Sequence, residues 1–436
     1  MPVAIPKSGS PPTLLQEPRM QLKCLAASAA VIAAMTGAAH AADANSPAFG
    51  DSFNVTDTSV DLSQLTRENF YDVLVPLAKK DGEMTFYSYW PPAPLVVFQN
   101  QIIPAFEKKY GIKVNFNSVE TNVGLPQLDA AYKEGKPSPM DGYFSSDLPA
   151  DLNEMANIRL TDILPNAADL DPALAYEYRG IEHNGAYVPF HGNQTVIAFN
   201  SSVVKDDEVP QTFEDLLAYS TANPGKVAIT SPLRGGSGSG FLTAVSHKLM
   251  SDDCVARWMD LSADEAAADQ LVNNSECFAP VWAYFNDLLE TAQITNGNTD
   301  TLNLMANGVA NIGTAWEDLT FSYVMGNQLP DTVRVTILGG GQPGGAEGAF
   351  IPSNTENLAA ALLFMDEILA PEHQAWKLAG FASRSPKTEL DASLIPEEAR
   401  KLLVPADIYA EGRISNANPV MSRVVRDAFA ANVLDK

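Results

Sequence analysis

Residues 84–116 read MTFYSYWPPAPLVVFQNQIIPAFEKKYGIKVNF, and this stretch decides the class of fold. Met84–Tyr89 has the residue types and alternation of a strand, and Gln99–Tyr110 has apolar residues at helical spacing. Gly111 stops the helix, and Ile112–Phe116 returns to a strand pattern. A strand, a helix and a second strand within about thirty residues predict a βαβ unit with parallel strands. The stretch therefore predicts an α/β protein.

The alternation of helices and strands continues on both sides of this unit. A helix is expected over Glu68–Lys80, where Asp81 and Gly82 stop it, and Tyr187–Asn200 is expected to be extended. Shorter strands are predicted over Asp141–Ser145, Lys226–Thr230, Asn311–Trp316 and Thr332–Leu338.

Capping residues predict where two further helices begin. Thr212 and Asp215 can cap a helix that extends to Ser220. Ser353 and Glu356 have the same spacing, ahead of a helix that places apolar residues on one face, namely Leu358, Leu362, Met365 and Leu369. The Gly-rich segment 339–345 is expected to be flexible crossing chain.

Length and charge limit the function. The 436 residues are 46% hydrophobic and 19% charged, an ordinary globular composition, and about 350 ordered residues suggest two lobes. Fifty-three acidic against 28 basic residues give a net charge of −25. This charge argues against binding to nucleic acid or to an anionic membrane, and we expect an acidic, solvated surface.

The N-terminal region has the pattern of a secretory signal. Residues 20–41 read MQLKCLAASAAVIAAMTGAAHA, in which Lys23 precedes an apolar run and Ala39-His40-Ala41 fits a cleavage site. We predict a signal peptide over residues 1–41, cleavage after Ala41 and a flexible leader over residues 42–65. No later stretch is apolar and long enough for a membrane span, so no stable membrane insertion is expected.

Two cysteines, Cys254 and Cys277, remain after cleavage. An even number in an exported chain favours one disulfide bond between them, and two unpaired thiols are the alternative. The four histidines of the mature chain have no metal-binding spacing. We therefore predict no catalytic residue, no metal site and no cofactor.

Six segments, in their order along the chain, resemble bacterial extracellular solute-binding proteins of family 1. The resemblance covers residues 66–430, and the similar branch includes thiamine-, polyamine-, ferric-ion- and phosphonate-binding proteins. The segments are Lys79–Tyr89, Ile103–Val114, Val188–Asn200, Val209–Leu217 together with Asn223–Val227, Gly348–Ser353 and Leu369–Trp376.

The resemblance implies a two-lobed periplasmic-binding-protein fold of type II, with hinge crossovers between the lobes. Lobe 1 would comprise residues 66–190 and 340–400, and lobe 2 residues 195–335 and 405–436. The implied protein is the periplasmic subunit of an ABC importer, a monomer without catalysis. Its partners would be a small-molecule ligand and the permease. A secreted hydrolase with a carboxylate pair remains the alternative from another class.

Candidate ligand contacts follow the ends of predicted strands, where ligands of open α/β sheets bind. Aromatic residues after the first strand would form a stacking platform or belong to the core, and polar residues after the third would bind a ligand or cap a helix. The candidates in these two turns are Tyr87, Tyr89, Trp90, Ser145, Ser146 and Asp147.

Residues 230–240 contain Arg234, Ser237 and Ser239 and are expected to continue into a helix at Phe241. A Gly/Ser loop at a helix N-terminus offers backbone N–H groups and partial positive charge, which suit an anion. The alternative is a flexible loop with an ordinary helix cap.

Trp316, Glu317 and Asp318 combine an aromatic face with two carboxylates, which suits a cation or a sugar. The alternative is a tryptophan packed in the hinge beside solvated acids. Phe350, with Glu347, extends the same argument into the return segment. Together these turns favour a cationic or zwitterionic ligand, and a carboxylate, a phosphonate or ferric ion remains the alternative.

Overall fold

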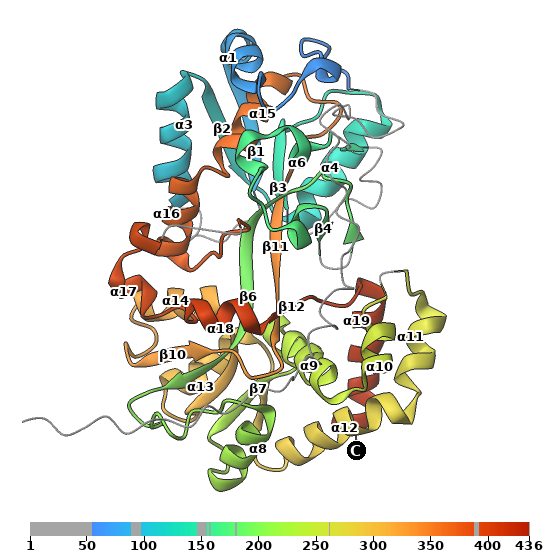
Figure 1. The fold of residues 1–436 in the computed structure, drawn as a ribbon, viewed down its shortest axis with the longest axis vertical. Helices are drawn as coiled ribbons and strands as arrows, with labels where there is room; N and C mark the ends of the chain where they lie inside the picture. Colours follow the sequence, from blue (N-terminus) through green and yellow to red (C-terminus); the bar gives the residue numbers. More distant parts are fainter. Residues whose placement is uncertain are drawn as a thin grey trace, which may run out of the picture. The chain divides into compact units, whose positions relative to one another are not determined.

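The computed structural model describes residues 55–88, 97–145, 155–156, 158–178, 181–260, 262–387 and 392–435. All of them lie in one compact unit, Ala44–Lys436, which Figure 1 draws. No helix formed by these described residues is long and apolar enough to cross a membrane. The predicted signal peptide and its cleavage site lie outside the described residues.

The predicted βαβ unit is confirmed. Strand β1 (Glu83–Ser88) pairs in parallel with β2 (Lys113–Ser118), and α3 (Ile103–Tyr110) precedes β2. On its other side, β1 pairs in parallel with β3 (Gly142–Ser145). Figure 1 shows these strands among the helices drawn in blue.

Glycines end two helices of this region as the sequence predicts. Gly82 follows α1 (Phe70–Asp81) with φ 73°, and Gly111 follows α3 with φ 72°. These left-handed conformations favour glycine, because it has no Cβ atom to clash. The chain therefore turns sharply into β1 and β2.

Helix α15 (Leu358–Glu367) corrects two expectations. Every one of its residues is buried, so it is a central helix and has no polar face. The predicted capping box at Ser353 and Glu356 is wrong, because the N-cap is Asn357 and its side chain makes no capping bond. Carboxylates from distant segments accept the free N–H groups instead: Asp57 accepts from Leu358, and Asp81 accepts from Ala360.

A second group of parallel strands follows. Strand β7 (Val227–Thr230) lies between β8 (Gln293–Thr295) and β9 (Ile312–Trp316) and pairs in parallel with both. The predicted capping box of α8 (Phe213–Ala222) is confirmed, since Thr212 and Asp215 bond reciprocally. The other helices of this region are α9 (Gly236–Leu249), α10 (Asp252–Trp258), α11 (Glu265–Val272), α12 (Ser275–Leu289), α13 (Asn298–Ala306), α14 (Glu317–Met325) and α19 (Pro419–Phe429).

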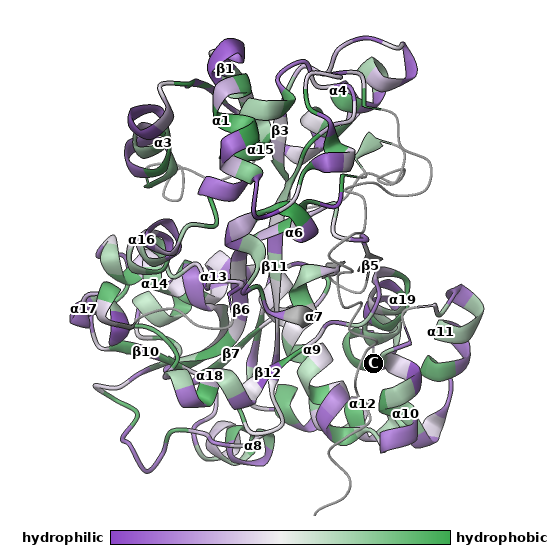
Figure 2. Ribbon diagram, turned by 45° about the horizontal axis from the view of Figure 1, so that its top comes forward, coloured by the Kyte–Doolittle hydropathy of each residue, from purple (hydrophilic) through white to green (hydrophobic). Residues whose placement is uncertain are grey.

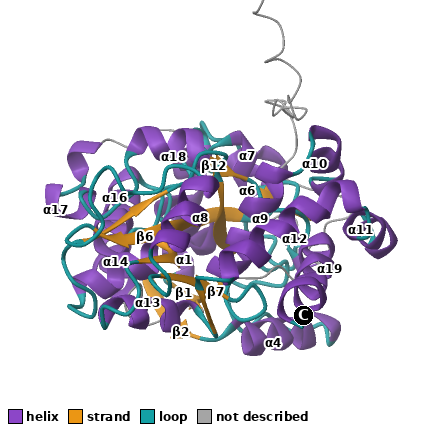
Figure 3. Ribbon diagram, turned by 90° about the horizontal axis from the view of Figure 1, so that it is seen from below, coloured by secondary structure: helices purple, strands orange, loops and turns teal. Residues whose placement is uncertain are grey.

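Two long antiparallel strands join the two groups. Strand β6 (Val188–Asn200) pairs with β9 and with β10 (Val333–Thr336), and β11 (Gln342–Phe350) pairs with both β6 and β3. The sheet order is β2-β1-β3-β11-β6-β9-β7-β8. Figure 1 shows β6 and β11 extending from one group of helices to the other, and Figure 3 shows the strands between helices. The predicted flexible crossing is corrected, because β11 begins at Gln342 within the Gly-rich segment.

The apolar clusters follow the alternation of side chains along β6. On one face, Tyr187 belongs to an apolar cluster around β3, and Ile197 belongs to a second cluster around α9 and α12. On the other face, Phe190 and Val196 belong to two further apolar clusters. Between Tyr187 and Ile197, the first face carries three buried polar residues, His191, Asn193 and Thr195. Figure 2 shows this polar middle of β6.

Short elements complete the described chain. They are the 3-10 turns Leu62–Gln64, Pro165–Ala167 and Ala392–Leu394, the π-helical turns Phe98–Ile102 and Ala430–Leu434, α4 (Thr121–Lys133), α6 (Leu160–Ile163), α7 (Pro172–Ala175), α16 (Pro371–Phe381), α17 (Glu397–Arg400), α18 (Ala406–Gly412), β4 (Glu177–Tyr178), β5 (Ile181–Glu182) and β12 (Arg413–Ile414). The expected flexible leader is corrected for residues 55–65, because Val60, Leu62 and Leu65 are buried in a core cluster.

Candidate functional site

Three helices begin at the same edge of the second group of strands. Because β7, β8 and β9 are parallel, their carboxyl ends at Thr230, Thr295 and Trp316 lie at one edge. Each strand is followed by a helix, respectively α9, α13 and α14. The N-termini of these helices carry partial positive charge, at the edge where open α/β sheets bind their ligands.

Hydroxyl groups join the strand ends beneath this edge. Ser237 donates to Asn298 Oδ1 at 2.8 Å, and its Oγ lies 3.0 Å from Thr230 Oγ1. Thr301 Oγ1 lies 2.6 Å from both Thr230 Oγ1 and Thr295 Oγ1. Ser237 is buried, so it stabilises the edge from within and does not face a ligand. The expected helix start at Phe241 is also corrected, because α9 begins five residues earlier at Gly236.

Trp316 lies against the start of α9. A Cβ atom added at Gly236 would lie 2.7 Å from Cζ2 of the indole, so the ring packs over a position that has room only for glycine. The indole is partly exposed, Arg234 is exposed and Ser239 is half-buried. Of the residues predicted for this turn, Arg234, Ser239 and Trp316 are therefore accessible to a ligand.

Glu317 differs from its expected role as a ligand contact. Its carboxylate accepts two hydrogen bonds from Arg384, at 2.6 and 2.8 Å, and a third from the Val404 N–H at 2.6 Å. The side chain is fully buried. Burial opposes the charge of Arg384, but the charge of Glu317 outweighs it and raises the pKa of the guanidinium. Glu317 therefore belongs to a structural ion pair.

The backbone of Arg384 pairs with β6, which positions this ion pair. Gly192 and Arg384 exchange two backbone hydrogen bonds of 2.8 Å, and a Cβ atom at Gly192 would lie 2.6 Å from the Arg384 carbonyl oxygen. The guanidinium also lies 4.1 Å above the ring of Tyr409. Glycine at position 192 therefore allows the segment after α16 to join the centre of the molecule.

Asp318 remains partly accessible. One of its carboxylate oxygens lies 3.5 Å from Nε2 of His191, and the Asp318 side chain is 28% exposed. The other ring nitrogen of His191 hydrogen-bonds to the hydroxyl of Ser383 at 2.7 Å. Asp318 is thus the predicted acid of this turn that can still meet a solute.

Glu347 lies on β11 directly opposite His191 on β6. It is 6% exposed, and Oε1 accepts a hydrogen bond from the Asn193 amide at 3.4 Å. Burial raises its pKa to about 8, so the carboxyl group retains its proton at neutral pH. The register shifts between Glu347 and Gly348, which marks a bulge at this point of β11.

Aromatic side chains surround the end of β3. Tyr87 is partly exposed, and its ring meets that of Tyr143 edge to face. Tyr187 donates from its hydroxyl to the carbonyl of Ser145 at 2.8 Å and accepts from the Gly348 N–H beside the bulge. Phe350 and the side chain of Ser145 are fully buried, so the structure assigns both to the interior. Tyr89, Trp90, Ser146 and Asp147 lie outside the described residues.

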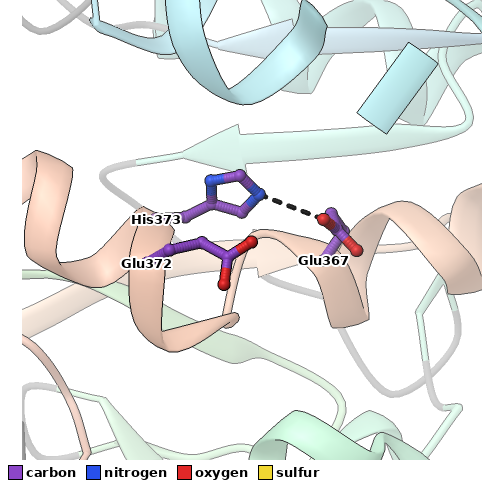
Figure 4. A group of neighbouring side chains, drawn as sticks. All are labelled: Glu367, Glu372 and His373. Atoms are coloured by element: carbon purple, nitrogen blue, oxygen red, sulfur yellow. Dashed lines mark hydrogen bonds and ion pairs between the residues drawn. The ribbon is translucent and has the colours of Figure 1, made fainter. Parts of the chain in front are cut away.

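Among the described residues, Glu367, Glu372 and His373 bring three potential metal ligands within 4.8 Å of one another. Figure 4 shows the His373 ring directed at Glu367, 3.1 Å away, with Glu372 beside them. Glu367 also pairs with Lys109 at 2.7 Å. Burial opposes its charge, but the hydrogen bonds from His373 and Lys109 lower the pKa of Glu367. These contacts describe an ion-pair network that joins α15, α16 and α3.

The predicted disulfide bond is present and joins α10 to α12. Cys254 and Cys277 are bonded, with their Cα atoms 5.6 Å apart. Both cysteines are buried in the cluster around α9 and α12. The bond therefore stabilises the packing of these two helices.

The model of a family described as bacterial extracellular solute-binding protein matches residues 101–397, more than half of the chain. This chain belongs to the bacterial extracellular solute-binding proteins. The family resemblance seen in the sequence is thereby confirmed. A comparison with curated proteins finds no match.

Solved structures show the same fold as this solute-binding protein. One is an ABC transporter from Clostridium perfringens, with a TM-score of 0.55, 15% identity, and 81% of this chain and 99% of that chain covered. A second is an ABC transporter substrate-binding protein from Bradyrhizobium japonicum, with a TM-score of 0.55 and 18% identity. The match covers 80% of this chain and 99% of that chain. A third is a spermidine/putrescine ABC transporter substrate-binding protein from Streptococcus pneumoniae, with a TM-score of 0.56 and 12% identity. The match covers 80% of this chain and 99% of that chain. The expected α/β, two-lobed fold class is confirmed.

Sequence reasoning missed several residues that shape the site. Arg384 and Asn193 were not singled out, and Tyr187 was placed in an extended segment without a role. From the sequence there was only a weak argument that Glu347 contacts a ligand. These residues lie in the middle of strands or in loops without a motif, and only the pairing of β6 with β11 and with residue 384 brings them together.

Proposed function

We propose that this solute-binding protein is the periplasmic subunit of an ABC importer, which captures a small solute and delivers it to a permease. Family membership supports the capture of a solute, and the predicted signal peptide supports export. The similar structures described above include an ABC transporter and two ABC transporter substrate-binding proteins. The chain acts as a monomer and performs no catalysis.

The solute binds between two lobes, which are divided as the sequence suggests. Lobe 1 contains β1, β2, β3 and α15, lobe 2 contains β7, β8, β9 and α9, and β6 and β11 form the hinge. The observation that carries this proposal is the edge where α9, α13 and α14 begin, with a partly exposed Trp316 above the start of α9. An aromatic ring beside a helix N-terminus offers both stacking and hydrogen bonding.

The solute carries at least one positive charge. Asp318 and Glu347 supply acidic groups near the hinge strands, whereas Glu317 is occupied by Arg384. The exposed Arg234 and the N-terminus of α9 favour an anionic group at the other end. A zwitterion satisfies both ends, with its cationic group toward the hinge and its anionic group toward α9.

A thermal-shift screen tests this function directly. Purified mature protein is heated with small organic cations, zwitterions, carboxylates and phosphonates. A solute that binds only the folded state at a hundred times its Kd stabilises it by about 2.7 kcal/mol and raises Tm. The same solute should be recovered unchanged after incubation. Steady conversion into a product would contradict the proposal and favour a hydrolase.

Trp316→Ala tests the site itself. Loss of the stacking surface should weaken binding of the stabilising solute about tenfold, because such contacts are worth about 1–2 kcal/mol. Trp376→Ala is the matched control, since Trp376 is 36% exposed and lies on α16 beside His373. Equal affinities of the two variants, measured by calorimetry, would place the solute elsewhere.

A further inference from the structure

The junction between α15 and α16 gathers three side chains that the proposed function does not use. Glu367 ends α15, and Glu372 and His373 lie in the first turn of α16. Each offers one ligand atom to a metal ion, and the three atoms lie within 4.8 Å of one another. Figure 4 shows the three side chains converging. We call them the junction cluster.

Glu372 is the unpaired member of the junction cluster. Glu367 and His373 are 1% and 0% exposed and lie 3.1 Å apart in a hydrogen bond. Glu372 is exposed, and its carboxylate has no hydrogen bond or ion pair with any residue that the structure describes. Two carboxylate groups this close repel each other unless a cation lies between them. The arrangement therefore favours a bound cation.

The imidazole of His373 can present a lone pair to the junction cluster. Nε2 faces Glu367, and the buried Nδ1 has no hydrogen-bond partner within the described part of the chain. No contact at Nδ1 thus fixes the tautomer of the ring. When the proton lies on Nδ1, Nε2 is an acceptor and can bind a metal ion.

Glu367 is held in place through its other oxygen. Oε2 accepts from Lys109 Nζ at 2.7 Å and from the Tyr110 hydroxyl at 3.4 Å, while Oε1 faces His373. Carboxylates that bind metals in proteins are commonly hydrogen-bonded in this way. The side chain of Lys109 is half exposed, so solvent screens its repulsion of a bound cation. Oε1 of Glu367 and Nε2 of His373 are therefore positioned before any metal binds.

The geometry points to a site for a divalent transition-metal ion, formed by Nε2 of His373 and one carboxylate oxygen each of Glu367 and Glu372. Ligand atoms about 2.1 Å from one ion lie about 3–4 Å apart. Glu367 and His373 already have this spacing, and the exposed Glu372 can rotate inward. One imidazole with two carboxylates suits Zn²⁺, and water from the exposed side completes four ligands. The ion joins α15 to α16, whichever solute the protein binds.

Calorimetry of the mature chain, prepared without a polyhistidine tag and stripped with EDTA, tests the site with ZnCl₂ as the probe. We expect one Zn²⁺ per chain and a higher Tm that EDTA reverses. Mg²⁺ and Ca²⁺ prefer oxygen ligands and should bind more weakly by a factor of at least about ten. Glu372→Gln should weaken Zn²⁺ binding by a similar factor.

Glu276→Gln is the matched control for Glu372→Gln. Glu276 is the second residue of α12, as Glu372 is the second residue of α16, and both are exposed. The control should bind Zn²⁺ as the unchanged chain does. Equal Zn²⁺ affinities of Glu372→Gln and Glu276→Gln, or no rise in Tm with Zn²⁺, would overturn the site.

A variant with stronger binding makes the test independent of any loss of folding. Glu372→His places a second imidazole on the exposed side and should strengthen Zn²⁺ binding, because imidazole is a preferred ligand of this ion. Glu276→His should leave the affinity unchanged. Glu372→His combined with His373→Gln should lose the gain, since only one imidazole remains. A Glu372→His variant that binds Zn²⁺ no more strongly than the unchanged chain, or a preference for Ca²⁺ over Zn²⁺, would also overturn the site.

Discussion

Two buried glutamates, Glu317 at the start of α14 and Glu347 in β11, have opposite surroundings. Glu317 is fully enclosed and accepts three hydrogen bonds of 2.6 to 2.8 Å from Arg384 and Val404. Glu347 is almost as deeply buried, but a longer bond of 3.4 Å joins it to the neutral amide of Asn193. Burial is therefore not what separates the two carboxyl groups.

These hydrogen bonds differ in their donors: Arg384 and the Val404 N–H donate to Glu317, and the Asn193 amide donates to Glu347. A buried carboxylate remains ionised when a guanidinium donates two bonds to it, and the pair then holds its elements together. A carboxyl group beside an amide avoids the cost of a buried charge by keeping its proton. The first arrangement suits a permanent connection between elements, and the second makes the charge of Glu347 depend on pH. The sequence alone favours the opposite assignment, because Glu317 adjoins a tryptophan.

Breaking the ion pair between Glu317 and Arg384 should have the largest effect on stability. Glu317→Gln leaves Arg384 buried without its carboxylate and should lower the free energy of unfolding by about 3–5 kcal/mol, as for other broken buried pairs. Urea unfolding at pH 7 measures this loss. Glu397→Gln disrupts an exposed pair with Lys401 and should leave the free energy of unfolding almost unchanged, because solvent screens that pair. Similar losses in both variants would show that the Arg384 pair is not structurally important.

The second-largest effect on stability should be the pH dependence that Glu347 causes. The folded-state pKa of Glu347 is raised to about 8 from an ordinary value of 4.5. Between these values the folded state holds a proton that the unfolded state has lost, so stability falls as pH rises. The expected loss from this group is about 2 kcal/mol between pH 6 and pH 8.

Glu347→Gln should remove this contribution. Compared with the unchanged chain, the variant should become more stable by about 2 kcal/mol as pH increases from 6 to 8. Urea unfolding at the two pH values measures the change, and other titrating groups cancel in the difference between the two proteins. Parallel pH profiles would show that Glu347 is ionised in the folded protein at neutral pH.

Patterns within a few residues were sufficient to predict the local structure. The βαβ unit depends on alternation and on Gly111, and the start of α8 depends on the spacing of Thr212 and Asp215. The disulfide bond followed from a count of two cysteines in a chain with a predicted secretory signal. Strand periodicity also predicted correctly that β9 ends at Trp316.

Contacts between distant segments could not be predicted in the same way. Glu317 and Arg384 are separated by 67 residues, and Asp57 reaches Leu358 across 301 residues. Both depend on which strands pair and in what register. The Gly/Ser loop illustrates the same limit, since its glycines allow α9 to approach Trp316 and Thr230, and its buried Ser237 bonds within the protein. Local composition indicated a binding loop, whereas tertiary packing explains most of its residues.

The smallest effect is expected for Asp318, the sequence neighbour of Glu317. Its carboxylate lies 3.5 Å from His191 Nε2 and is 28% exposed, so solvent screens the interaction. The pair is ionic only while the imidazole is protonated, and its contribution should therefore increase toward acid pH. Asp318→Asn should lower the free energy of unfolding by at most about 1 kcal/mol at pH 5 and by less at pH 8. Asp287→Asn, an exposed change on α12, is the control and should show no such trend. A larger loss at pH 8 than at pH 5 would mean that Asp318 stabilises the fold through a contact other than His191, and the contrast between a structural Glu317 and an accessible Asp318 would then fail.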